Sequence, residues 1–340
     1  HTGQQVGLFR NESDTITDIA VGGAPDRQLL AIASAGSSIP VYALNSTSSR
    51  TARLVLDAGR FLTDVEYSPD GSQLAVAEDL GLIRILDAKS LDVLTEVNLG
   101  TRTLDLAWDP RGGTISVARM DKANAVGQTT APQPAVAVLG VLNSARTNDS
   151  HTTSESVSNS ERPDELAWRL DLQGFWPPFR PASRISYSPN GQHVAVCSRR
   201  DEVVVLHVET GQVMATIPAP SRGSGAIAFS PDSTLLAVGD VEGTLRLFDV
   251  PSGTERSSAT AERGTIRSCV FSRDGRTVYS AGGAHGEIRR WTVPDLKLKA
   301  VYRGPREVSN AIALSPDGLT LAIASRDHKV TLMDAETGDV

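Results

Sequence analysis

The chain has 340 residues, of which 40% are hydrophobic and 5% aromatic, and its formal net charge is −7. This length suffices for one large all-β domain or two ordinary domains with a sizeable core. The negative charge disfavours a nucleic-acid binder, and no apolar run approaches the roughly 18 residues of a membrane span. There is no recognisable signal peptide, and two cysteines are too few for a disulfide scaffold, so we expect a cytoplasmic protein.

A short turn motif recurs along the chain at a spacing of about 42 residues. It reads YSPDG at Tyr67–Gly71, WDPRG at Trp108–Gly112, YSPNG at Tyr187–Gly191, FSPDS at Phe229–Ser233, FSRDG at Phe271–Gly275 and LSPDG at Leu314–Gly318. A degenerate seventh copy occupies Ile16–Ser34. One interval is longer than the others by about 37 residues, so one repeat unit carries an insertion.

Each repeat unit predicts four short β-strands. The first ends at the motif, as in Asp64–Tyr67, because Pro and Asp favour a type I turn and the next Gly accepts a positive φ. A second strand follows, as in Gln73–Ala77, and a third ends in an apolar residue and Asp, as in Ile83–Asp87. A turn such as ETG leads into a fourth. The middle strands are nearly continuous apolar runs, which predicts sheets that are covered on both faces, as in a ring of stacked sheets.

This arrangement resembles the WD40-repeat family of β-propellers over nearly the whole chain. The resemblance is carried by the SPDG-type turns, by the stretch LAVGDVEGTLRLFD, and by the strand ends Leu86–Asp87, Phe248–Asp249 and Met333–Asp334. It implies an all-β fold, a seven-bladed β-propeller of four-stranded antiparallel blades. The Gly-His dipeptide of the family is missing from every copy, and a Trp ends the third strand only at Trp291. The family's hydrogen-bonded His–Ser–Asp–Trp tetrad is therefore expected to be incomplete.

We expect one propeller over residues 1–340, with blades at about 14–57, 61–100, 102–173, 183–218, 224–260, 265–303 and 308–340. The seventh unit has only three strands of its own, and a strand at residues 4–10 is expected to supply the fourth. Closing the ring in this way leaves no unpaired sheet edge. The competing explanation is that the chain was cut from a longer repeat array, and both can hold.

The third unit carries the extra length. Its predicted second and third strands are Thr114–Met120 and Ala135–Asn143, and Leu166–Leu172 is its predicted outer strand. The segment Ser144–Glu165 is rich in Ser, Thr, Asn and Glu and poor in apolar residues, which is typical of a mobile loop.

The repeats place charged side chains on one face of the predicted ring, called here the top face, which carries the inter-blade loops and the loops between second and third strands. Three residues before the first-strand hydrophobe stand Asp18, Asp64, Asp105 and Arg184 in four successive units. The inter-blade loops carry Arg60, Arg102, Arg180, Arg222, Arg263 and Arg306. The carboxylates would hold a Lys or Arg of a partner, and the guanidinium groups would hold carboxylate or phosphate.

Trp176 is an expected aromatic anchor for a partner, and the alternative is that it packs against a blade edge. The repeated charges also have a structural alternative, in which they pair within a blade, as Arg60 with Asp64. Exposed pairs of this kind contribute only about 0–1 kcal/mol.

The sequence therefore predicts a non-catalytic platform that binds a protein or peptide segment through its top face. We expect a monomeric domain, a module of a larger signalling or regulatory protein, with neither nucleic-acid nor membrane partners. The six histidines are scattered, and HExxH, G-x-S-x-G and phosphate-cradling loops are missing, so we assign no catalytic residue, metal site or cofactor.

Two alternatives remain. A metal-dependent hydrolase or lactonase could act in the central channel, with Asp18, Asp64 and Asp105 holding a hard cation such as Ca²⁺. The other alternative is a structural spacer without a specific ligand.

Overall fold

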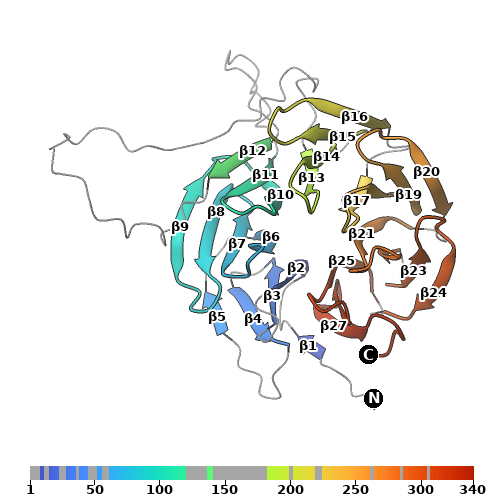
Figure 1. The fold of residues 1–340 in the computed structure, drawn as a ribbon. Helices are drawn as coiled ribbons and strands as arrows, with labels where there is room; N and C mark the ends of the chain where they lie inside the picture. The colour runs from blue at the N-terminus through green and yellow to red at the C-terminus, as the bar shows by residue number, and fades with distance from the viewer. Residues whose placement is uncertain are drawn as a thin grey trace, which may run out of the picture.

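The computed structural model describes residues 8–10, 15–22, 28–35, 38–44, 52–55, 61–119, 136–140, 182–198, 202–218, 224–260, 264–283, 286–304 and 307–340. In these residues, antiparallel sheets stand radially around a central channel (Figure 1). Six sheets have four strands and one has three. The all-β propeller predicted from the repeats is thereby confirmed.

The strands run in chain order from the channel outward, and each sheet is one blade. Blade 1 comprises β2 (Ile16–Gly22), β3 (Leu29–Ser34), β4 (Ser38–Ala43) and β5 (Ala52–Val55), and blade 2 comprises β6 (Leu62–Tyr67), β7 (Gln73–Glu78), β8 (Leu82–Asp87) and β9 (Val93–Asn98). Blade 3 comprises β10 (Thr103–Trp108), β11 (Thr114–Arg119) and β12 (Val136–Gly140). Blade 4 comprises β13 (Ala182–Tyr187), β14 (His193–Ser198), β15 (Glu202–His207) and β16 (Val213–Pro218).

The remaining blades follow the same order. Blade 5 comprises β17 (Ser224–Phe229), β18 (Leu235–Asp240), β19 (Thr244–Asp249) and β20 (Glu255–Thr260), and blade 6 comprises β21 (Ile266–Phe271), β22 (Thr277–Gly282), β23 (Ile288–Thr292) and β24 (Leu298–Tyr302). Blade 7 comprises β25 (Ser309–Leu314), β26 (Thr320–Ser325), β27 (Lys329–Asp334) and the N-terminal strand β1 (Leu8–Arg10).

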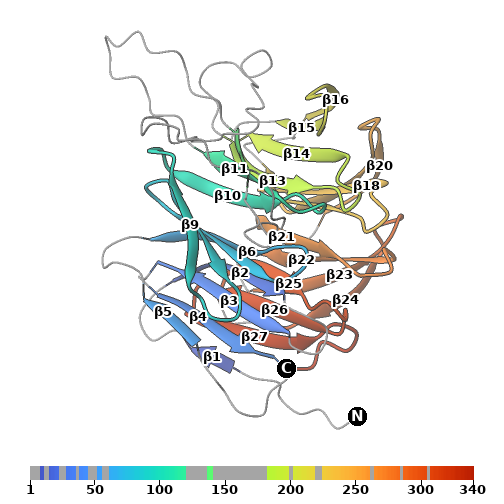
Figure 2. The same cartoon turned by 60° about the vertical axis from the view of Figure 1, so that its left-hand side comes forward.

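The N-terminal strand closes the ring. β1 pairs antiparallel with β27, with Phe9 opposite Val330, and so completes the last sheet (Figure 1). Blades 1 and 7 lie side by side (Figure 2), and Ile19 and Leu30 of blade 1 share an apolar cluster with Leu332 of blade 7. The predicted closure is confirmed for Leu8–Arg10, whereas residues 4–7 of that prediction lie outside the described residues.

Blade 3 has three strands in the described part of the chain. β11 and β12 confirm its predicted second and third strands. The predicted outer strand Leu166–Leu172 and the predicted mobile loop Ser144–Glu165 lie outside the described residues.

The core lies between the blades, and successive residues of a middle strand serve opposite neighbours. In β7, Leu74 and Val76 belong to a cluster with Ala31 of blade 1, whereas Ala75 and Ala77 belong to a cluster with blade 3. Side chains alternate between the two faces of a strand, and here both faces are covered, so the strand is apolar throughout. This is the physical reason for the continuous apolar runs in the sequence.

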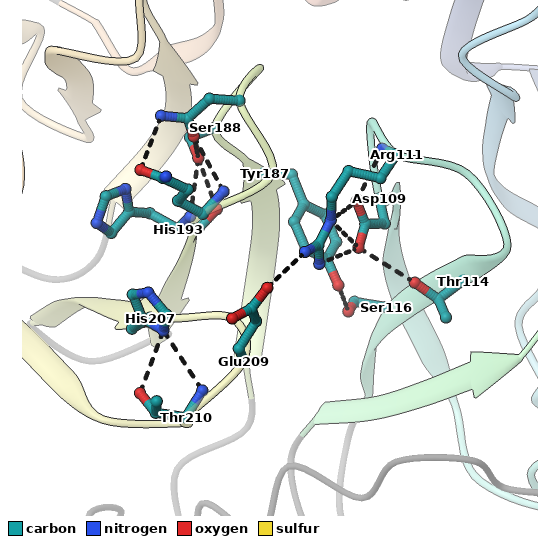
Figure 3. A network of polar contacts seen from close by, with 12 residues as sticks. Asp109, Arg111, Thr114, Ser116, Tyr187, Ser188, His193, His207, Glu209 and Thr210 are labelled. Carbon is teal, nitrogen blue, oxygen red and sulfur yellow. Dashed lines mark hydrogen bonds and ion pairs between the residues drawn. The ribbon is translucent and has the colours of Figure 1, made fainter.

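Part of the expected tetrad is present in blade 6. The indole Nε1 of Trp291 donates a hydrogen bond of 2.9 Å to Ser280 Oγ, and both residues are buried. The SPDG-type turns of other blades are stabilised by hydrogen bonds within the turn. In blade 2, for example, Ser68 Oγ donates to Asp70 Oδ1 at 2.6 Å. Blade 3 has Asp109 and Arg111 at the positions of Ser68 and Asp70, and Arg111 donates to Asp109 and to Glu209 of blade 4, the latter at 3.3 Å (Figure 3).

Two tyrosines at the same repeat position differ in their hydrogen bonding. Tyr187 Oη of blade 4 lies 2.6 Å from Ser116 Oγ of blade 3 (Figure 3). Tyr67 Oη of blade 2 is buried without a hydrogen-bond partner. Ala31 pairs with Ala20 in blade 1 in the same way as Ser116 pairs with Ala107 in blade 3. Ala31 therefore occupies the position of Ser116 and offers no hydroxyl group to Tyr67.

We therefore predict opposite effects of removing these two hydroxyl groups. Tyr187→Phe should lower the free energy of unfolding by about 1 kcal/mol, because a satisfied hydrogen bond is lost. Tyr67→Phe should leave it unchanged or raise it by about 1 kcal/mol, because a buried unsatisfied hydroxyl is removed. Urea denaturation followed by tryptophan fluorescence measures both. An equal loss in the two variants would contradict the assignment.

Candidate functional site: the channel cavity

A cavity of about 360 Å³ opens in the central channel, and the inner strands of all seven blades line it. Its charged lining residues fall into two groups. The acidic wall consists of Asp18, Asp64, Glu66 and Asp105 on blades 1–3, and the basic residues Arg184 and Arg267 come from blades 4 and 6. The acidic wall thus spans three adjacent blades, Arg184 comes from the next blade, and Arg267 comes from blade 6.

Every inner strand has a one-residue register shift near its start, and the position shared by Asp18, Asp64, Asp105 and Arg184 follows directly after it. In β6, for example, Leu62 and Asp64 pair with consecutive residues of β7, so Thr63 is the extra residue. The shift recurs in β2, β10, β13, β17, β21 and β25. A bulge of this kind redirects side chains. It gives the aligned residues a common place around the channel.

Each of the three aspartates accepts a hydrogen bond from the backbone of the next blade. Asp18 Oδ2 accepts from Val65 N–H at 3.4 Å, Asp64 Oδ2 accepts from Leu106 N–H, and Asp105 Oδ2 accepts from Ile185 N–H at 2.7 Å. In blade 6 a serine replaces the aspartate, and Ser268 Oγ accepts from Ile312 N–H at 3.1 Å. These side chains therefore tie neighbouring blades together, which the sequence analysis did not predict.

The three carboxylates differ in their exposure to solvent. Asp64 and Asp105 are 5% and 7% exposed, whereas Asp18 is half-buried. Burial follows from the contacts with the next blade, which cover one oxygen of each carboxylate. Asp18 makes the longest of these contacts and is the most accessible of the three.

Arg184 joins the acidic wall. Its Nη1 lies 2.9 Å from Asp105 Oδ1, with the two side chains 35% and 10% exposed. Burial by itself disfavours the charged guanidinium, but the carboxylates of Asp105 and Asp18 outweigh it, and the pKa of Arg184 is raised. Arg184, which aligns with the three aspartates, is therefore an ion-pair partner of Asp105.

Two buried carboxyl groups of the acidic wall have raised pKa values. Burial, followed by the charges of Asp18 and Asp105, raises the pKa of Asp64 well above its usual value. Burial raises the pKa of Asp105 to about 6, although Arg184 and the N–H of Ile185 oppose it. The wall therefore loses negative charge as the pH falls towards 6 and below.

Glu66 is a member of the wall that sequence reasoning missed. Its Oε2 accepts a 2.8 Å hydrogen bond from Trp108 N–H, and burial raises its pKa well above the usual range despite that bond. A signal existed, because Glu66 directly precedes Tyr67, and the corresponding residue in every other repeat is uncharged.

Of the other predicted site residues, only Arg102 belongs to the described part of the chain. Arg102 is exposed on the link between blades 2 and 3. Arg60, Arg180, Arg222, Arg263, Arg306 and Trp176 lie outside the described residues, so their roles in partner binding stay predictions. The same holds for the alternative pairing of Arg60 with Asp64.

The described residues contain no group of three or more His, Cys, Asp or Glu side chains arranged to hold a metal ion. In each of the three aspartates, one carboxylate oxygen instead accepts a hydrogen bond from a backbone N–H group of the next blade. In the same part of the chain, no helix is long and apolar enough to cross a membrane.

The sequence matches to known proteins all point to WD repeats. Residues 211–249 match the family model described as WD domain, G-beta repeat, which here covers the outer strand of blade 4 and the first three strands of blade 5. WD repeat-containing protein SL1-17 of Schistosoma mansoni is 26% identical over 156 residues, 45% of this chain and 50% of that protein. WD repeat-containing protein 91 homolog of Dictyostelium discoideum is 31% identical over 114 residues, 32% of this chain and 15% of that protein.

The chain thus spans half or less of the length of the curated relatives it matches. A chain in the crystal structure of the mitotic checkpoint complex superposes with a TM-score of 0.75 at 16% identity, covering 97% of this chain and 91% of that one. The repeat match, the relatives and the ring of sheets agree, and the chain is a WD40-repeat β-propeller.

Proposed function

We propose that this propeller is a non-catalytic, monomeric platform that binds a polypeptide segment at the channel cavity, as one module of a larger protein. The acidic wall facing the cavity is the observation that carries the proposal. The relatives are WD repeat proteins, and the superposed chain belongs to a checkpoint complex, so the fold is used in protein assemblies. No observation in the described residues favours the hydrolase alternative.

The acidic wall selects a positively charged group, which we assign to a Lys or Arg side chain of the partner segment. Asp18 is its first contact. This carboxylate is more accessible than Asp64 and Asp105, and its bond to Val65 N–H is long at 3.4 Å. A carboxylate offers about four acceptor sites, so Asp18 retains capacity for a charged donor.

A peptide selection tests this proposal without a known partner. A random peptide library displayed on phage is selected on the immobilised propeller, and wild type should enrich sequences with a common Lys or Arg. Asp18→Asn should lose that preference, because the amide keeps an acceptor for Val65 N–H but lacks the charge. Glu242→Gln is the control, since Glu242 is exposed between β18 and β19 and does not line the cavity.

Failure of the wild type to enrich any sequence would contradict the platform function. Equal preference for basic peptides in wild type and Asp18→Asn would show that the acidic wall is not the binding site.

The affinity for a basic peptide should fall as the pH falls. Because the pKa of Asp105 is about 6 and those of Asp64 and Glu66 are also raised, a fall in pH removes negative charge from these three residues of the wall. An enriched basic peptide should therefore bind more weakly as the pH falls from about 7.5 to about 5.5. Calorimetric titration across this range measures the change. A pH-independent affinity would contradict the pKa assignments, and Asp105→Asn should make the profile less steep near pH 6.

A further inference from the structure

Arg267 is a charged cavity residue that the acidic wall does not engage. It is the extra residue of the register shift in β21, between Ile266 and Ser268, and it lines the cavity from blade 6. β21 faces the inner strands of blades 1–3 across the channel (Figure 1). Within the described part of the chain, Arg267 has neither a hydrogen-bond nor an ion-pair partner for its guanidinium group.

The charges that shift the pKa of Arg267 are both positive. Burial, then the guanidinium groups of Arg326 and Arg184, lower the pKa of Arg267. Arg184 is already paired with Asp105 at 2.9 Å. Arg326 is exposed, and its Nε makes only a 3.4 Å hydrogen bond to the neutral Asn310 Oδ1. Asn310 lines the cavity, so Arg326 lies beside it, and Arg267 and Arg326 have no ion-pair partner among the described residues.

The backbone that carries Arg267 is held firmly in place. A Cβ atom on Gly225 would lie 2.0 Å from Ile266 O, and one on Gly282 would lie 2.0 Å from Thr265 O. Only residues without a side chain permit this approach. Thr265 Oγ1 also donates to Val241 O at 3.2 Å. Close packing from blades 5 and 6 fixes the start of β21, so the backbone of Arg267 need not be ordered when a ligand binds.

We propose that Arg267 and Arg326 form an oxyanion subsite that takes a carboxylate of the bound segment. The planar guanidinium fork matches a carboxylate in two parallel hydrogen bonds. A phosphate dianion is disfavoured, because the opposite wall carries Asp18, Asp64, Glu66 and Asp105. The proposal rests on the proposed function only in that the ligand is a polypeptide. Such a segment would place a basic residue at the acidic wall and a carboxylate at Arg267.

The subsite is tested directly with small anions. Protein labelled with ¹⁵N-arginine is titrated with sodium acetate, and the Nε–Hε signals of Arg267 and Arg326 should move together on one saturating curve. In Arg267→Gln the Arg326 signal should no longer respond. Arg276→Gln is the matched control, because Arg276 is exposed in a turn of blade 6 and does not line the cavity.

Two results would overturn the subsite. One is a response no larger than that to sodium chloride at equal ionic strength. The other is saturation by inorganic phosphate at lower concentrations than acetate, which would replace the carboxylate with a phosphate group.

The peptide selection separates this inference from the proposed function. Wild type should enrich an Asp or Glu at a fixed distance from the basic residue, and Arg267→Gln should keep the basic preference but lose the acidic one. Its affinity for the enriched peptide should fall about tenfold, the loss expected for a charge-assisted hydrogen bond. An unchanged acidic preference overturns the subsite while the platform stands. If no sequence is enriched, the platform fails and the acetate titration alone decides the subsite.

Discussion

Replacing Asp105 with alanine is expected to lower the free energy of unfolding by about 2–3 kcal/mol. The change leaves the buried N–H of Ile185 without its acceptor, which costs about 1–3 kcal/mol. It also removes the ion-pair partner of Arg184. Breaking a fully buried pair costs about 3–5 kcal/mol, but Arg184 is 35% exposed, so solvent screening reduces that part. Relief of the repulsion from Asp18 offsets a further fraction.

Asp105→Asn is the matched comparison. Its amide oxygen still accepts from Ile185 N–H, so we expect a loss of about 1 kcal/mol or less. Urea denaturation of both variants at pH 7.5 gives the two values. Equal and small losses would contradict the assignment of Asp105 as the link between blades 3 and 4.

Replacing Gly81 with alanine is expected to cost about 3 kcal/mol of unfolding free energy, because two costs add. Gly81 has φ = +93°, where a side chain is strained. An added Cβ would also lie 2.2 Å from Thr101 O and 2.9 Å from Thr101 N, and such overpacking costs about 1–3 kcal/mol. Thr101 precedes β10, so this turn fixes the strand that carries Asp105.

Gly100→Ala separates the two costs. Gly100 also has a positive φ, +63°, but a Cβ there would meet nothing within 4 Å. We expect a loss of about 1 kcal/mol from backbone strain alone. Thermal and urea unfolding of the two variants give the difference, and equal losses would show that the contact with Thr101 does not matter.

The ring could be predicted because its causes are local in sequence. The SPDG-type turns mark the strand ends, and counting them gave the number of repeats. The apolar middle strands indicated sheets covered on both faces. The last unit lacked a fourth strand, which predicted the closure by β1. The pairing of Phe9 with Val330 shows that counting the strands of the last unit was sufficient. The boundaries of strands such as β19 and β27 agree with the apolar–Asp endings from which they were predicted.

The site could be predicted only in part. Aligning the repeats identified Asp18, Asp64, Asp105 and Arg184 as equivalent, and the structure gathers them around one cavity. Their contacts could not be predicted, because a hydrogen bond from Asp105 to Ile185 depends on the bulge and on how blades meet across about 80 residues of sequence. Arg267 was missed for the same reason, since its position as the extra residue of a register shift has no sequence signature.

The central claim is that the acidic wall of the cavity recognises a positive charge, and a double-mutant cycle tests it most directly. Calorimetry compares wild type and Asp18→Asn, each with an enriched peptide and with the same peptide after its basic residue is changed to glutamine. The account predicts a coupling free energy of about 1 kcal/mol or more between Asp18 and that residue. If the losses of binding free energy from the two single changes sum to the loss from the double change within about 0.3–0.5 kcal/mol, the claim is contradicted.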